Sequence, residues 1–144
     1  MKLAIDNNAL AEDFFSDTRV LGIVAPVKDY RFCWVVNQAL GCDFRLNNDL
    51  EIQLAKKGRQ YFFSIYEYNE PGSSLGNYIY SNQCNGEYLL PEFRHLDFLW
   101  LLKGDEVKND YLNMLQQSIK DIAGVQLITE LDKDKIKNKI HLVF

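Results

Sequence analysis

Hydrophobic and polar positions divide the chain into a middle part with a two-residue period and outer parts that contain helical spacings. Residues 20–26, "VLGIVAP", form an apolar run that ends at a proline and predict a buried strand. Residues 26–41 begin with proline and end with glycine, which is typical of a helix. Their apolar residues cover more than one stripe, so we expect this helix to pack under a sheet and also against another helix or a second subunit.

The middle of the chain predicts an antiparallel meander. Apolar side chains occupy even positions from residue 44 to residue 54, which predicts a half-buried strand with one apolar face, bent at residues 47–49. Residues 56–59, "KKGR", and the pair Asn85-Gly86 predict two hairpin turns. Residues 96–104, "LDFLWLLKG", are apolar on both faces and predict a central strand.

The last third repeats the strand and helix pattern of the first. Residues 104–124 have apolar positions on one helical face, acids near the start and glycine at the end. Residues 125–131 predict a strand, residues 132–139 at most a short helix, and residues 140–144 a short strand or tail. The order predicts an α+β fold: a two-layer sandwich with a mainly antiparallel sheet of about six strands and two main helices. Its ferredoxin-like order would have an enlarged sheet.

Length and composition indicate one domain over residues 1–144, with residues 1–18 as a loosely packed N-terminal segment. The net charge of −4 and the pI of about 5.1 argue against binding to DNA or to acidic membranes. No apolar run is long enough for a signal peptide or a membrane helix. We therefore expect a cytoplasmic location and no contact with a membrane.

The three cysteines, Cys33, Cys42 and Cys84, lack paired spacings, so neither a disulfide framework nor a zinc site is expected. The two histidines, His95 and His141, also lack the short spacings of metal ligands. We expect no metal site and no cofactor.

The segment "LPEFRHLDF", residues 90–98, places two acids and a histidine just before the predicted central strand. It resembles the signature of the bacterial IPExxxVDY family, with Leu90, Leu96 and Phe98 in place of Ile, Val and Tyr. Residues 21–41 and 124–132 also resemble that family, so the resemblance covers most of the chain.

The resemblance implies that Pro91, Glu92 and Asp97 occupy motif positions, and it brings no activity, cofactor or substrate. Phe98 lacks the hydroxyl group of the tyrosine found at that position. Glu92, His95 and Asp97 could act as an acid and base pair with a neighbouring imidazole. In an extended chain, however, Glu92 and Asp97 would point to opposite faces, which favours a structural role.

We therefore hypothesise that one of the two acids anchors the first long helix. That helix has no Ser, Thr, Asn or Asp before Pro26, so the N–H groups of residues 27–29 need acceptors. Glu92 or Asp97 would accept hydrogen bonds from this helix start, or pair with Lys28. In the competing interpretation, these same N–H groups beside Lys28 hold a small anionic ligand such as a phosphate or carboxylate, with Lys28, Asp29 and Tyr30 as candidate binding residues.

The predicted sheet is also rich in aromatic rings, which some sheets use to stack single-stranded RNA. Packing within the sheet and a tyrosine-rich subunit interface explain these rings better. The sequence thus favours a non-enzymatic module that binds a partner protein or a small ligand, as a homodimer through the tyrosine-rich sheet or the first helix. The alternatives are an enzyme that uses Glu92, His95 and Asp97, and an RNA-binding sheet.

Overall fold

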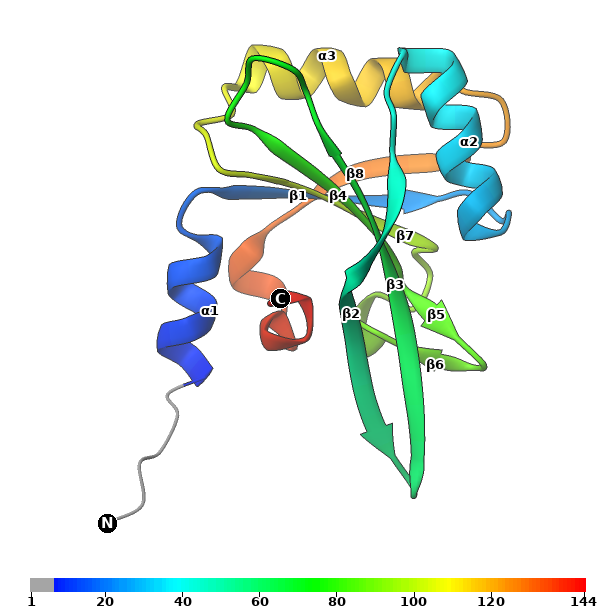
Figure 1. Cartoon of the computed structure of the whole chain (residues 1–144), viewed down its shortest axis with the longest axis vertical. Helices are drawn as coiled ribbons and strands as arrows, with labels where there is room; N and C mark the ends of the chain where they lie inside the picture. The colour runs from blue at the N-terminus through cyan, green and yellow to red at the C-terminus, as the bar shows by residue number, and fades with distance from the viewer. Residues whose placement is uncertain (1–6) are drawn as a thin grey trace.

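A six-stranded antiparallel sheet lies at the centre of the protein, whose computed structural model describes residues 7–144 (Figure 1). The strand order is β2-β3-β4-β7-β1-β8, and every neighbouring pair is antiparallel. The strands are β1 (Thr18–Val24), β2 (Arg45–Lys56), β3 (Arg59–Asn69), β4 (Gly76–Ser81), β7 (Phe98–Lys103) and β8 (Leu127–Leu131). A small hairpin, β5 (Gln83–Cys84) and β6 (Glu87–Tyr88), forms a separate sheet. The predicted α+β class is confirmed.

Helices and short 3₁₀ segments cover both faces of the sheet. Helices α2 (Asp29–Leu40) and α3 (Asn109–Lys120) pack on one face, as predicted. Helix α1 (Asn7–Phe15) and the C-terminal 3₁₀ segments η2 (Lys133–Lys135) and η3 (Lys139–Leu142) pack on the other. The sandwich therefore has a partial third layer that the predicted two layers lack. Its pieces are too short to show a helical period in the sequence.

The strand order explains why the ferredoxin-like pattern is enlarged. β7 and β8 flank β1, and α3 crosses over β1 to join them, as in a split β-α-β unit. β3 and β4 lie between β7 and the edge strand β2. All residues of β7 except Lys103 are buried, which confirms the predicted central strand.

Both long helices start later than the sequence predicted. Helix α2 begins at Asp29 and not at Pro26, because the N–H of Val27 bonds to the carbonyl of Ala25 in a tight turn, 2.7 Å from nitrogen to oxygen. Helix α3 begins at Asn109, beyond the acids at its predicted start. Helix α2 ends as predicted, with Gly41 in the left-handed conformation at φ 67°.

The two predicted hairpin turns are both present. Lys57 and Gly58 have φ 53° and 76°, and Asn85 and Gly86 have φ 49° and 87°. Two consecutive residues with positive φ are typical of the tight turn that matches the twist of adjoining strands. The first turn joins β2 to β3 and the second joins β5 to β6.

A bulge in β2 turns its two halves toward different cores. The pairing with β3 shifts register between Leu46 and Glu51, at the predicted bend. The Asn47 side chain accepts hydrogen bonds there from the main-chain N–H groups of Asp49 and Leu50, at 2.9 and 3.2 Å. As a result Phe44, just before β2, packs in the core under α2 and α3, whereas Ile52 packs in the opposite core. The prediction of one apolar face along residues 44–54 was therefore wrong.

The N-terminal helix is packed against the sheet. Ala11, Phe14 and Phe15 are buried in the core opposite α2 and α3. The ammonium group of Lys133 donates to the carbonyls of Phe15 and Thr18, each at 2.9 Å, and closes the end of the helix. The predicted loose packing is thus wrong for residues 11–18, while residues 1–6 lie outside the described part of the chain.

Candidate functional site

Asp97 holds the connection between β1 and α2. Its Oδ2 accepts a hydrogen bond from the N–H of Ala25 at 2.8 Å. Its own N–H donates to the carbonyl of Ile23 at 2.8 Å, so the acid is fixed to the end of β1 from two sides. The predicted anchor is present, but it holds Ala25 rather than residues 27–29, because the helix starts later than predicted.

Glu92 anchors a different part of the chain. It lies in the 3₁₀ segment η1 (Pro91–Phe93), and its Oε2 accepts a hydrogen bond from Asn138 Nδ2 at 2.5 Å. Its Oε1 is buried and has no hydrogen-bond partner within residues 7–144. Nearby, His141 Nδ1 lies 2.7 Å from the carbonyl oxygen of Leu89. Glu92 therefore holds the C-terminal segment, and of the two acids that the sequence offered as an anchor, Asp97 is the one that holds the connection before α2.

The candidate catalytic residues are dispersed. His95 is exposed, and Pro91 opens the η1 turn, away from the start of α2. Phe98, at the tyrosine position of the signature, is buried and stacks on Phe32 of α2 with ring centroids 4.4 Å apart. Of the three proposed acid and base residues, only Asp97 lines the hollow described below.

One polar residue that sequence reasoning missed organises the whole signature segment. Asn82, which follows β4, is fully buried. Its Nδ2 donates to the carbonyls of Phe93 and Leu96 at 3.0 and 2.9 Å. Its Oδ1 accepts from the N–H of Leu90 at 2.9 Å. The Asn-rich loop composition around residue 82 predicts a turn, and it does not distinguish this buried asparagine from an exposed one.

The start of α2 faces a hollow of about 660 Å³ on the side of the sheet that carries the long helices. Four of the seven candidate site residues line it: Lys28, Asp29, Tyr30 and Asp97. The opposite wall comes from β3, β4 and β5 and includes Phe62, Ser64, Ser81, Gln83 and Cys84. This volume lies in the usual range of small-molecule sites, about 300–1,000 Å³.

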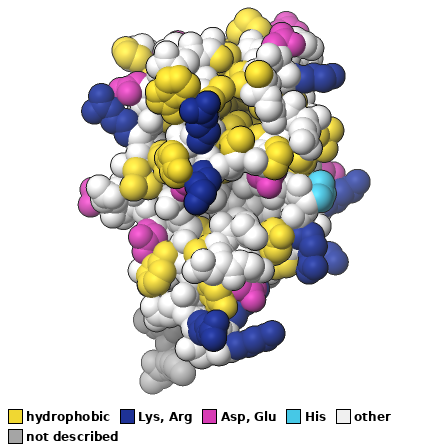
Figure 2. All heavy atoms as spheres, turned by 90° about the vertical axis from the view of Figure 1, so that its right-hand side faces the viewer, with side chains coloured by type: hydrophobic (Ala, Val, Ile, Leu, Met, Phe, Trp, Pro, Cys, Tyr) yellow, Lys and Arg dark blue, Asp and Glu magenta, His cyan; other side chains and the backbone are white. Residues whose placement is uncertain are grey.

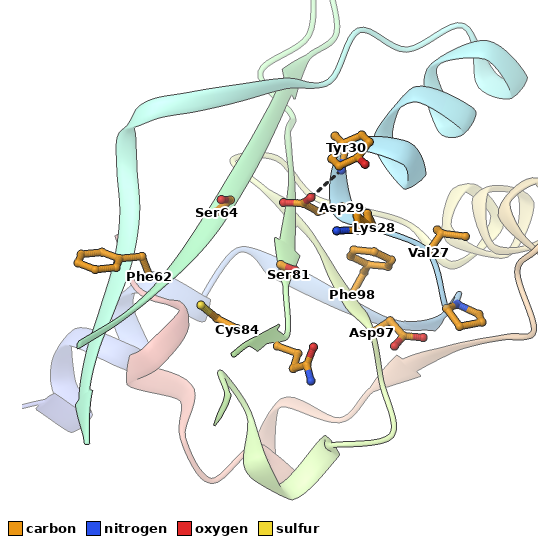
Figure 3. Close-up of a pocket in the computed structure, with 12 residues that line it drawn as sticks. Val27, Lys28, Asp29, Tyr30, Phe62, Ser64, Ser81, Cys84, Asp97 and Phe98 are labelled. Atoms are coloured by element: carbon orange, nitrogen blue, oxygen red, sulfur yellow. Dashed lines mark hydrogen bonds between the residues drawn. The ribbon is translucent and has the colours of Figure 1, made fainter. Parts of the chain in front are cut away.

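The polar side chains of the hollow are largely free to bind a ligand. Figure 3 shows Lys28, just before α2, and Asp29, its first residue, pointing toward the strands that carry Ser64 and Ser81. Within residues 7–144, Lys28 forms no ion pair, and the two serine hydroxyls form no hydrogen bond. Asp29 Oδ1 accepts from the N–H of Tyr30 at 2.8 Å and keeps further acceptor capacity.

The partly buried phenol of Tyr66 lies near Asp29. Burial raises the pKa of Tyr66, and the negative charge of Asp29 raises it further. Burial likewise raises the pKa of Cys33, with a smaller contribution from Asp29. Both groups therefore stay neutral at physiological pH.

Aromatic side chains border the hollow on both sides. The side chain of Tyr30 on α2 is 63% exposed and that of Phe62 on β3 is 47% exposed. One turn further along α2, Trp34 is exposed and lies under the guanidinium group of Arg31, 5.3 Å from its ring centroid. Figure 2 shows hydrophobic side chains interspersed with Lys and Arg on the face at the right of Figure 1. Helix α2 is thus buried on one side only within the described chain, not on two.

The remaining rings of the sheet are not displayed for base stacking. Phe63 and Tyr80 are fully buried, and Tyr80 donates its hydroxyl to the carbonyl of Leu142 at 2.7 Å. Tyr66 and Tyr68 pack in the core under α2 and α3. Phe62 is the exposed exception among the aromatic residues of the described strands.

Sequence reasoning found the helix side of the hollow and missed its sheet side. Ser64, Ser81 and Gln83 sit on strands in which polar residues indicate an exposed face. Only the order of strands in space brings them opposite Lys28, and that order depends on pairings between distant segments.

The described residues contain no group of three or more His, Cys, Asp or Glu side chains that could hold a metal ion. No helix among residues 7–144 has the length and apolar character needed to cross a membrane. Comparisons with protein-family models and with curated proteins gave no match to this chain.

Proposed function

We propose that this protein is a non-enzymatic module that binds a small, overall neutral, zwitterionic ligand in the hollow at the start of α2. The observation that carries the proposal is that a cation without an ion-pair partner among the described residues and a carboxylate lie side by side in the lining of the hollow. Lys28 and Asp29 both line the hollow and form no ion pair with each other. A ligand with both a positive and a negative group satisfies both side chains, as an α-amino acid would.

The charge balance of the lining supports a zwitterion over the simple anion expected from the sequence. Lys28 contributes one positive charge, and Asp29 and Asp97 contribute two negative charges. A phosphate or carboxylate would gain from Lys28 but would face both carboxylates. A positive group on the same ligand removes that conflict.

The geometry also supports binding over catalysis. Glu92 and His95 lie outside the hollow, and Asp97 already accepts a hydrogen bond from Ala25. General acid and base work requires titratable groups within reach of one substrate proton. The enzyme that the sequence left open would need those three groups together.

Binding can be tested by titrating isotopically labelled protein with matched ligands and following amide chemical shifts. The set comprises free α-amino acids, their N-acetyl derivatives, which lack the cation, and their amides, which lack the anion. We expect shifts at Lys28, Ser64 and Ser81 with free amino acids only. Equal shifts with N-acetyl derivatives would replace the proposal by an anion site, and no shift with any member of the set would refute it.

The two charged residues can be tested against a control pair on the other long helix. Lys28→Met and Asp29→Asn should each weaken binding roughly tenfold or more, since each removes one charged contact. Lys108→Met changes the residue that precedes α3, and Asp110→Asn changes the acid in its first turn. Both residues lie outside the hollow, so both variants should leave the affinity unchanged. Equal losses in both pairs would point to a general charge effect.

We also propose a cytoplasmic location. Cys33, Cys42 and Cys84 are all free, as expected in a reducing compartment. Membership of the bacterial IPExxxVDY family remains a proposal that rests on the signature segment and on the resemblance of residues 21–41 and 124–132.

A further inference from the structure

Strand β2 is a free edge of the sheet. It runs for 12 residues and pairs with β3 alone among the described strands. Together the two strands form a long hairpin that projects beyond the body of the protein (Figure 1). An exposed edge with unpaired main-chain groups is a ready site for pairing with another strand.

The turn geometry shows which main-chain groups of β2 face outward. Lys56 and Arg59 flank the two-residue turn and therefore exchange hydrogen bonds. Hydrogen-bonded and non-bonded pairs alternate along an antiparallel ladder, so Leu54 and Ile52 also bond toward β3. The N–H and carbonyl groups of Glu51, Gln53 and Ala55 consequently point away from β3, to the open side.

The side chains of the same stretch form two different rows. Leu50, Ile52 and Leu54 lie on the face of the α1 core, where Ile52 is buried and its two neighbours are partly buried. Glu51 and Gln53 lie on the opposite face and are exposed. A second strand placed alongside would therefore meet one apolar row and one polar row.

We propose that the outer edge of β2 pairs antiparallel with the same edge of a second copy of this chain. In the register that we infer, Ile52 lies opposite Ile52 of the second copy, and Leu50 lies opposite Leu54. Glu51 then lies opposite Gln53, and the two residues exchange main-chain hydrogen bonds. The two six-stranded sheets become one continuous sheet around a two-fold axis.

The neighbouring registers are worse for identifiable reasons. In the register centred on residue 51, Glu51 lies opposite Glu51 of the second copy, which is a like-charge pair. In the register centred on residue 53, the charged Lys56 lies opposite Leu50 in the apolar row. The proposed register avoids both and leaves Lys56 opposite Asn48.

A second copy suits this edge better than it suits the exposed stripe of α2. On α2, Lys28 and Arg31 accompany the exposed rings of Tyr30 and Trp34. A two-fold contact between two such stripes would bring like charges together. This inference is independent of the ligand proposed above, and either can fail without the other.

The register can be tested with two charged substitutions at one exposed position. Gln53→Lys should strengthen the dimer and Gln53→Glu should weaken it, each by roughly three- to tenfold in the dissociation constant, because residue 53 would face Glu51 of the second copy. Sedimentation equilibrium of the full chain measures this constant. If both variants weaken the dimer, residue 53 faces itself and the proposed register is wrong.

Main-chain pairing can be separated from side-chain effects at the same position. Gln53→Pro removes an outward N–H and should give a monomer, whereas Gln53→Ala keeps the N–H and should remain dimeric. Trp34→Glu on α2 should also remain dimeric. A wild-type chain that is monomeric at high micromolar concentration, or a dimer that is broken by Trp34→Glu and not by Gln53→Pro, would overturn the proposal.

Discussion

The starts of α2 and α3 have nearly the same local structure and very different surroundings. Each is preceded by an extended lysine, Lys28 at φ −68° and ψ 153° and Lys108 at φ −77° and ψ 155°. Neither lysine side chain caps its helix, and each helix has an aspartate in its first turn. Local sequence signals therefore cannot explain why only one of them opens onto the large hollow.

The difference lies in what holds the preceding connection. Before α2, the carboxylate of Asp97 accepts the N–H of Ala25. Before α3, the guanidinium group of Arg19 donates to the carbonyl of Val107 at 3.0 Å and to Asn109 Oδ1 at 2.8 Å. Arg19 thus occupies the space beside the α3 start with a side chain of this chain, whereas the space beside α2 stays open. Two helix starts with the same local structure therefore differ in accessibility: the α3 start is filled by the Arg19 side chain, and the α2 start is open to a ligand.

The largest effect is expected from removing the residue that positions the α2 anchor. Asn82→Ala breaks three hydrogen bonds of a fully buried side chain, so we expect a loss of about 3 kcal/mol in the free energy of unfolding. Asn77→Ala is the control, since buried Asn77 accepts one side-chain bond, from Trp100 Nε1. Urea denaturation measures both. Equal losses for the two variants would show that Asn82 has no special role.

The α2 anchor itself should have the next largest effect. Asp97→Ala leaves the buried N–H of Ala25 without its acceptor and should cost about 1–3 kcal/mol of stability. Asp97→Asn keeps an acceptor oxygen and should cost clearly less. The same denaturation experiment compares the two, and a full loss with Asn would mean that the charge matters rather than the hydrogen bond.

The α3 anchor should be weaker. Arg19→Met removes the donors to Val107 and Asn109 and the ion pair with Glu130, and we expect a cost of about 1 kcal/mol, because these groups are partly exposed and water can replace them. Glu130→Gln should cost less still and lose its effect at high salt. Thermal unfolding at low and high ionic strength checks this, and a cost for Arg19→Met above that of Asp97→Ala would reverse the comparison.

The smallest perturbation is a labelling experiment that leaves stability unchanged. Burial raises the pKa of Cys33, and burial together with the charge of Glu70 raises that of Cys42, so both supply little reactive thiolate at pH 8. Cys84 lines the hollow and should be alkylated first by iodoacetamide. A bound amino acid should slow the reaction at Cys84 alone, and mass spectrometry of the labelled peptides would show if Cys42 is protected instead.

Several elements of the fold could be predicted from the sequence because local patterns of residues determine them. The apolar run of β7, the glycine after α2 and the two tight turns all appear where the periodicity and turn residues predict them. Helix starts were misplaced because the turn at residues 26–28 delays the first helical hydrogen bond. The sequence did not distinguish Glu92 from Asp97 as the anchor, because the partner of Glu92, Asn138, is distant in sequence.

Only the helix side of the candidate site could be predicted from the sequence, because only that side depends on a local pattern. Lys28, Asp29 and Tyr30 follow one another and mark a helix start, whereas Ser64 and Ser81 join them only through the pairing of β3, β4 and β7. Asn82 was missed because burial of a polar residue is decided by the chain folded around it. Single-sequence patterns contain no direct record of such distant contacts.

The bulge in β2 fixes the length of the chain between Leu46 and Ile52. Phe44, before the bulge, packs in the core under α2 and α3, whereas Leu50, Ile52 and Leu54, after it, pack in the opposite core. Deleting one residue there would rotate the following half-strand by half a turn and exchange its buried and exposed side chains. Insertions and deletions should therefore be tolerated at the tip of the β2–β3 hairpin but not between Leu46 and Ile52. Related chains with this fold should keep the number of residues in that interval constant.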